Sequence, residues 1–238
     1  MQPQAQHQMM GYDRASTMFS PDGRLLQVEY AKKTVKQGSV AMGIVCKDGV
    51  ILVADKRIAD KLILPTSVEK VFQVDDHIAA TPTGLVMDGR VLIERAQLIA
   101  QQHRVTYDDS IDVLTLVKEI SDIKQAHTQY GGARPYGVSL LIAGINENPH
   151  LFMTDPTGVY FEYKATAIGE YEQEIKNILE KTYKDSITMD LGIKTAITSL
   201  KAVLGKEFAI ERIDAIRISK ATKKFERIST EELQKYNV

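Results

Sequence analysis

The sequence predicts an α+β fold in which two β-sheets pack face to face between two layers of helices, a four-layer αββα sandwich. Three observations predict it. Strand-like segments come in pairs joined by tight turns, which favours antiparallel sheets. Some strands are apolar throughout, such as residues 50–54, and therefore need cover on both faces. Helix pairs alternate with the strand pairs along the chain, and helices outside two packed sheets supply that cover.

The composition is that of an ordinary globular protein. The chain has 238 residues, of which 44% are hydrophobic and 26% are charged, and its formal net charge is -1. No linker or low-complexity stretch divides it, so we expect one domain over residues 1–238. A charge this close to neutral favours neither nucleic acid nor an anionic membrane as a partner.

Cysteine and histidine usage gives no reason to expect a metal or a cofactor. The single cysteine, Cys46, has no internal partner for a disulfide, and the five histidines show none of the paired spacings of metal sites. No window is long and apolar enough to cross a bilayer, and the first residues do not resemble a secretory signal. We therefore expect a cytoplasmic location.

The N-terminal region consists of a tail, a turn and a helix. Residues 1–11 are rich in glutamine and lack acids, which predicts a mobile tail. Residues 20–23, Ser-Pro-Asp-Gly, match a type I turn position by position. A helix over about residues 24–36 follows, with its apolar seam at Leu25, Val28, Ala31 and Val35. A helix this short is marginal alone, so we expect it to pack on the rest of the molecule.

The first half of the sandwich, which we expect over about residues 39–228, begins with four strands. We expect them near residues 40–44, 50–54, 68–74 and 78–81, the first two joined by a turn at 47–49. Two helices follow. The first runs from about 83 to 103 with Met87, Val91 and Ala96 on its inner face. The second begins at a Ser110 cap and buries the face of Val113, Val117, Ile120 and Lys124.

The second half repeats the pattern. Strands are expected at 138–145, 151–153 and 159–163, and helices at about 170–183 and 189–204, the latter capped by Thr188 or Ser186. A hairpin of residues 213–219 and 225–228 closes the sheet. Residues 229–232, Ser-Thr-Glu-Glu, form a capping box for a short terminal helix.

Several of these stretches together resemble the α subunits of the proteasome core particle, of the archaeal type. The matching stretches are Tyr12-Asp13-Arg14, Phe19 to Leu25, Gln27 to Ala31, Gly38-Ser39, Glu69-Lys70, Gly84-Leu85, Gln129 to Gly132, Arg134 to Val138, Glu162 to Ala165 and Ala167 to Gly169. The resemblance covers about residues 11–220. It implies the sandwich fold of the N-terminal-nucleophile hydrolases with an extra N-terminal helix. It also implies that seven copies of the chain associate into an α ring, which stacks on rings of proteasome β subunits.

The resemblance also implies that the chain has no catalytic residue. Catalytic relatives use a threonine that has become the first residue, whose α-amino group is the base. Here the corresponding residue is Ser39, and its nitrogen lies in a peptide bond, although Asp55 and Lys70 fall near the relatives' acid and lysine. We expect the threonine-type endopeptidase activity to reside in the β subunits. Two alternatives remain: a hydrolase that cuts itself before Ser39, and a binding module that forms no ring.

A gate is the first role that the resemblance implies. The tail would lie over the ring pore, and Tyr12, Asp13, Arg14, Pro21 and Tyr30 would hold the displaced tails when the gate is open. Two phenols donating to one carboxylate, beside a rigid proline, have suitable chemistry. The alternative for Tyr12 and Asp13 is simple anchoring of a loop.

Docking is the second implied role. Lys70, with Gly38, Gly84 and Leu85, would line a pocket that receives the C-terminal carboxylate of a regulatory AAA ATPase activator. The alternative is a solvated lysine on a strand.

The loop of Tyr130, Gly131, Gly132 and Arg134 would narrow the entrance below the gate, so that only unfolded polypeptide substrates pass. Taken alone, its residues indicate a flexible loop in which Arg134, before a proline, directs its cation outward.

Overall fold

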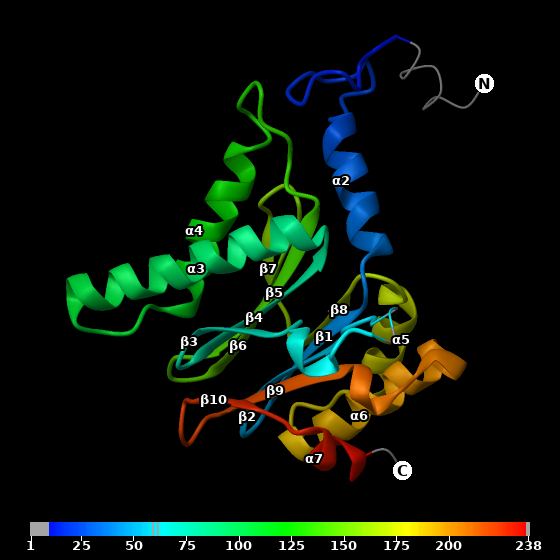
Figure 1. Ribbon diagram of the computed structural model, residues 1–238. Coiled ribbons are helices and arrows are strands. Elements are labelled where there is room, and N and C mark those ends of the chain that lie inside the picture. Colours follow the sequence, from blue (N-terminus) through cyan, green and yellow to red (C-terminus); the bar gives the residue numbers. More distant parts are fainter. Residues whose placement is uncertain (1–9, 59, 61, 237–238) are drawn as a thin grey trace.

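The computed structural model describes residues 10–58, 60 and 62–236, so most of the expected tail lies outside the described residues. Within them, the predicted αββα sandwich is confirmed (Figure 1): two antiparallel sheets pack together between two layers of helices. One sheet has the order β10-β9-β2-β1-β8 and the other the order β3-β4-β5-β6-β7.

The strands of the first sheet are β1 (Ala41–Cys46), β2 (Gly49–Asp55), β8 (Ala165–Ile168), β9 (Ile213–Ser219) and β10 (Phe225–Arg227). Those of the second are β3 (Phe72–Asp75), β4 (Ile78–Gly84), β5 (Val138–Ile145), β6 (Pro149–Thr154) and β7 (Tyr160–Glu162). The α-helices are α2 (Leu26–Gln37), α3 (Val86–Tyr107), α4 (Val113–Ala126), α5 (Glu172–Thr182), α6 (Met189–Leu204) and α7 (Thr230–Gln234), and short 3-10 turns occupy Pro65–Ser67, Gly205–Glu207 and Ile210–Arg212.

Strand β2 shows why the sheets need cover on both faces. Its side chains alternate between two cores: Ile51 and Val53 pack beneath α5 and α6, whereas Leu52 and Ala54 lie between the sheets. Every residue of the strand is buried. Helices α3 and α4 cover the outer face of the other sheet, where Leu92 belongs to a third core. None of the described helices is long and apolar enough to cross a membrane.

Helix α2 stands apart from the layers, against β4 and β5 (Figure 1). It begins at Leu26, two residues later than expected, because Leu25 has extended backbone and precedes the first helical turn. The buried seam is therefore Leu26, Val28, Ala31 and Val35, and Leu25 is only half-buried. The other three predicted seam residues are buried as expected, and the helix packs on the rest of the molecule as expected, through its contacts with β4 and β5.

The inner face predicted for α3 was wrong in two of three positions. Met87 and Val91 are 66% and 44% exposed, while Ala96 is buried as expected. The face that meets the sheet is set instead by Leu92 and Ala96, which follow one helical stripe. The stripe begins near the N-terminus of α3, where Gly89, which has no side chain, lets the helix approach Pro82 closely.

The start of β3, the cap of α4 and the presence of β8 also differ from expectation. Strand β3 starts at Phe72, because the amides of Lys70 and Val71 donate to the Asp214 carboxylate rather than to a strand. Helix α4 is capped by Asp112 in place of Ser110, and its carboxylate accepts from the Thr115 amide. Residues 165–168, expected only to lead into a helix, form β8 and pair with β1.

Candidate functional site

A cavity of about 740 Å³ opens beside the C-terminal end of α2. Gly38, Lys70, Gly84 and Leu85, for which the family resemblance implied a common pocket, all line it. They come from the end of α2, the segment before β3, and the junction of β4 with α3. Apolar side chains, among them Phe72, complete the wall. Residues far apart in the sequence therefore meet around one hollow.

The glycines of this cavity are sites of close backbone approach. A Cβ on Gly38 would lie 2.5 Å from the Gly84 nitrogen, and a Cβ on Gly84 would lie 2.1 Å from the Gly137 carbonyl oxygen. Gly84 also has φ +127°, which L side chains rarely adopt. Part of the cavity wall is thus main chain, and it leaves no room for side chains at these two positions.

Lys70 is one of four cationic residues that line the cavity, with Lys56, Arg57 and Arg90. Asp214 holds its amide at 2.8 Å and Thr81 Oγ1 donates to its carbonyl oxygen at 2.8 Å, so the backbone is fixed on both sides. Burial lowers the pKa of the amine to about 8; Asp55 opposes this shift and Arg57 adds to it. Within the described part of the chain, the Lys70 Nζ makes no hydrogen bond or ion pair. An anion entering the cavity would supply that partner.

Ser39 also lines the cavity, but its surroundings are not those of a nucleophile. It follows α2 directly through Gly38, so its nitrogen is a peptide amide, and its carbonyl oxygen accepts from Thr83 Oγ1 at 3.1 Å. The buried Asp55 is held by Arg212 through two hydrogen bonds of 2.7 and 2.9 Å. Among the described residues, no group of three or more His, Cys, Asp or Glu side chains could hold a metal ion.

Two of the five expected gate residues, Asp13 and Tyr30, meet at the other end of α2. The Asp13 carboxylate accepts from the Tyr30 hydroxyl at 3.4 Å, and the Asp13 carbonyl accepts from Gln27 Nε2 at 2.5 Å. Tyr12 is half-buried and Arg14 is exposed. The structure thus brings Asp13 and Tyr30 together across seventeen positions of sequence.

The predicted turn at residues 20–23 is confirmed. The Gly23 amide donates to the Ser20 carbonyl at 2.8 Å, and Ser20 Oγ accepts from the Arg24 amide at 3.2 Å. Pro21 lies exposed at the corner of this turn. The turn therefore presents a rigid proline to solvent next to the start of α2.

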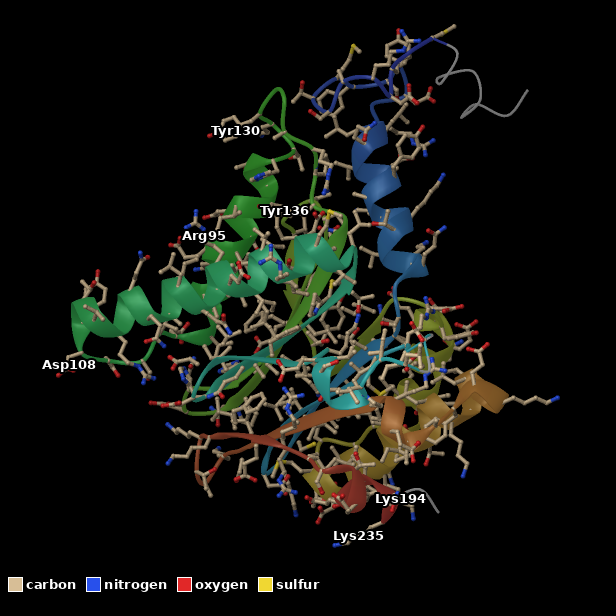
Figure 2. The ribbon with its side chains drawn as sticks, in the orientation of Figure 1. Arg95, Asp108, Tyr130, Tyr136, Lys194 and Lys235 are labelled. Carbon is tan, nitrogen blue, oxygen red and sulfur yellow. The ribbon has the colours of Figure 1, made fainter. Side chains whose placement is uncertain are left out.

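The loop of residues 128–135 lies beside the segment that precedes α2 (Figure 1). Tyr130, near the tip of this loop, is 67% exposed (Figure 2). Gly131, Gly132 and Arg134 share a depression of about 540 Å³ with Arg14. Gly132 has φ +84°, and a Cβ added there would meet nothing within 4 Å.

The Arg134 side chain is 54% exposed, as an outward cation would be, but it is also bound to an acid that the sequence did not suggest. Its guanidinium donates to both carboxylate oxygens of Asp88 on α3, each at 2.6 Å. Burial raises the pKa of Asp88, but the hydrogen bonds from Arg134 and the Gly137 amide outweigh it, so the pKa lies below its ordinary value. Sequence reasoning missed Asp88, since an acid in the first turn of a helix ordinarily indicates only a favourable helix-dipole contact.

The fold is that of a protein of the proteasome type, and comparison with known proteins shows the family. The proteasome family model matches residues 35–218, and the model of the N-terminal signature of A-type proteasome subunits matches residues 12–33. The chain is 52% identical over 225 residues to the proteasome α subunits of Thermococcus sibiricus and Methanocaldococcus jannaschii, covering 94% of this chain and 86% of each relative. The chain therefore belongs to the family of α subunits of the proteasome core particle.

Proposed function

We propose that this chain is a non-catalytic subunit of the outer, heptameric ring of the core particle, where it docks an activator and gates the entry of substrates. The observation that carries this proposal is the position of Lys70. Its amine lies in a cavity walled by Gly38, Gly84 and Leu85, and within the described residues it makes no hydrogen bond or ion pair, although the charge of Asp55 acts on it. An ammonium group so placed is suited to capture a chain end.

The occupant that fits is the C-terminal carboxylate of a regulatory AAA ATPase. A carboxylate would form a charge-assisted hydrogen bond with Lys70, and apolar side chains such as Phe72 would take up the residues before it. The low local polarity that depresses the pKa of Lys70 also strengthens its pairing with an anion.

The lack of peptidase activity follows from the covalent position of Ser39. A hydroxyl nucleophile of this superfamily needs a free α-amino group as its base, whereas the Ser39 nitrogen is an amide. The nearby Asp55 is committed to Arg212. Cleavage of substrates in the cytoplasm would thus fall to the β subunits, and a self-processed hydrolase is the disfavoured alternative.

The gate itself would be the tail of residues 1–11, most of which lies outside the described residues. Support comes from its anchor, since Asp13 is held by Tyr30 and Gln27 of α2. The exposed Tyr130 on the adjoining loop would narrow the passage for unfolded polypeptide.

The docking role is tested with particles assembled from this chain and a β partner. The probe is a fluorescent octapeptide with an apolar end and a free C-terminal carboxylate, compared with its C-terminal amide. We expect Lys70→Ala to weaken the carboxylate form about tenfold and to leave the amide unchanged. Lys70→Arg and the exposed Lys118→Ala are the controls. Equal affinity of the two peptides for the unmodified particle would rule out carboxylate capture.

The gating role has its own test. Particles whose α chains lack residues 1–10 should hydrolyse short peptides faster without any activator. Native mass, measured in parallel, confirms that the shortened chain still forms rings. An unchanged rate in intact particles would argue against a gate.

A further inference from the structure

The peptide groups of Gly137 lie between the cavity, α2 and the loop of residues 128–135. The Gly137 carbonyl oxygen accepts from the Leu85 amide and from Thr34 Oγ1, both at 2.9 Å. Its amide donates to Asp88 Oδ2 at 2.8 Å. One residue therefore has hydrogen bonds to the cavity wall and to the first turn of α3, and it lies within hydrogen-bond distance of α2. The Thr34 hydroxyl has a single proton and also lies 2.8 Å from the Ala31 carbonyl oxygen, so its bond to Gly137 is one of two that it can donate.

The packing around Gly137 leaves little slack. A Cβ on it would lie 2.8 Å from both Leu85 Cδ1 and Thr34 Oγ1, and a Cβ on Gly84 would lie 2.1 Å from the Gly137 oxygen. Packed main chain of this kind does not deform gradually. A ligand that displaces Leu85 must therefore carry Gly137 with it or break these bonds.

Asp88 and Arg134 extend this connection to the loop. Asp88 is 5% exposed and accepts from Gly137 and, through both carboxylate oxygens, from Arg134. The two-pronged geometry fixes the orientation of the guanidinium as well as its distance. Between Arg134 and Gly137 stand Pro135, whose φ is fixed by its ring, and Tyr136, whose ring packs 4.5 Å from that of His127. This arm of the loop is therefore stiff.

The far end of the loop reaches the segment that carries the gate residues. Gly131, Gly132 and Arg134 line one depression together with Arg14 and Gln27. Gln27 in turn binds the Asp13 carbonyl. A shift of the loop would therefore alter the surface against which the gate segment rests.

We propose that Asp88 and Arg134 are positioning residues that couple the docking cavity to the entrance loop: a ligand that contacts Leu85 changes the position of Tyr130 through Gly137 and the Asp88–Arg134 ion pair. This inference rests on the proposed docking function. It adds that the position of the loop depends on whether the cavity is occupied, so that the loop is more than a fixed constriction. Spatial continuity alone does not establish such coupling, so the test measures it directly.

The test places a reporter at position 130. Cys46 is 3% exposed and burial raises its pKa to about 12, so a thiol-reactive fluorophore will label a Tyr130→Cys chain at the new site. The labelled chain is combined with a β partner, and the particle is titrated with the carboxylate octapeptide. We expect a shift in emission that saturates with binding. Arg134→Ala and Asp88→Asn should reduce this shift at least about threefold, and Arg134→Lys should restore part of it.

The matched control is Arg104→Ala. Arg104 lies on the same helix as Asp88 and also binds a buried carboxylate, that of Asp75, at 2.5 Å, but at the far end of α3. The Arg104→Ala particle should keep the full shift in emission. This result would separate a loss of coupling from a general loss of α3 stability. Peptide affinity is measured in every variant, because coupling is reciprocal and removal of the ion pair must change the affinity as well.

Each outcome decides the proposal. If the peptide binds and the label does not respond, or if the shift survives intact in Arg134→Ala, the coupling is refuted while the docking function stands. If carboxylate and amide peptides bind alike, the docking function fails. The coupling is then judged by Leu85→Ala, which must change the emission of the labelled particle, and must cease to do so when Arg134 is also replaced.

Discussion

The guanidinium of Arg212 holds the buried carboxylate of Asp55, with Nη2 2.7 Å from Oδ2 and Nε 2.9 Å from Oδ1. The pair joins the end of β2 to the 3-10 turn that precedes β9. Their side chains are 17% and 1% exposed, so the charges are largely withdrawn from water. An acid positioned near Ser39 thus serves the structure of the sandwich.

Loss of Arg212 should therefore be severe. Arg212→Ala leaves an unpaired buried charge, and we expect a loss of about 3–5 kcal/mol in the free energy of unfolding, measured by urea denaturation. Arg90→Ala breaks an ion pair whose side chains are 68% and 57% exposed, and it should change stability by less than about 1 kcal/mol. Similar losses in the two variants would contradict this account of Asp55.

Ser39→Ala tests the absence of catalysis. Because the Ser39 nitrogen is an amide, the hydroxyl has no base, and peptide hydrolysis by the assembled particle should stay within about twofold of the parent. The mass of the purified chain should include the residues before Ser39. Loss of hydrolysis together with a chain that begins at Ser39 would establish the self-processing alternative.

The charge of Lys70 predicts how docking depends on pH. Its pKa lies at about 8, so the ammonium that pairs with a carboxylate is lost as the pH rises through that value. The affinity for the carboxylate octapeptide should fall between pH 7.5 and 9.5 by about tenfold in total, the same loss as expected for Lys70→Ala. In Lys70→Arg the affinity should remain flat over this range, since arginine stays charged. A flat profile in the parent would exclude Lys70 as the carboxylate partner.

Lys124 should make stability depend on pH. It is fully buried on α4, where Nζ donates to Thr154 Oγ1 at 2.5 Å, and burial lowers its pKa to about 7. Between pH 7 and its ordinary value of 10.5, the unfolded chain binds more protons at this site than the folded one, so the free energy of unfolding rises with pH there. Below pH 7 Lys124 is charged in both states, and the full cost of burying its charge is subtracted from the free energy of unfolding.

Replacement of Lys124 isolates this effect. Lys124→Met should flatten the rise in the free energy of unfolding between pH 7 and 10, as followed by urea titrations at successive pH values. The exposed Lys118 lies on the same helix, and Lys118→Met should keep the parent's slope. A slope that is identical in all three chains would show that Lys124 titrates normally.

Two glycines, one lining the cavity and one in the loop of residues 128–135, should differ strongly in their tolerance of alanine. Gly84→Ala forces a Cβ to within 2.1 Å of the Gly137 oxygen at φ +127°, and we expect a loss of at least about 3 kcal/mol or failure to assemble. Gly131→Ala adds a Cβ that meets nothing within 4 Å, and it should cost less than about 1 kcal/mol. Denaturation midpoints and native mass check both, and a tolerant Gly84 would disprove the close approach.

Local patterns predicted much of the fold. The apolar run at β2 required two covering layers, and the spacing of Val117 and Ile120 predicted the buried face of α4 correctly. These predictions succeeded because strand and helix periodicity directly record which side faces a core. The inner face of α3 failed because its stripe depends on how closely the helix approaches Pro82, which no periodicity reports.

The chain sequence by itself determined the covalent position of Ser39 and the turn at residues 20–23, and its resemblance to the proteasome α subunits singled out four residues that line one cavity. Only the tertiary structure decided that Arg134 turns back to Asp88 and that Gly137 joins the loop to the cavity wall. The reason is physical: backbone approach and ion pairing depend on distances between segments remote in sequence, and those distances exist only once the sheets and helices have packed.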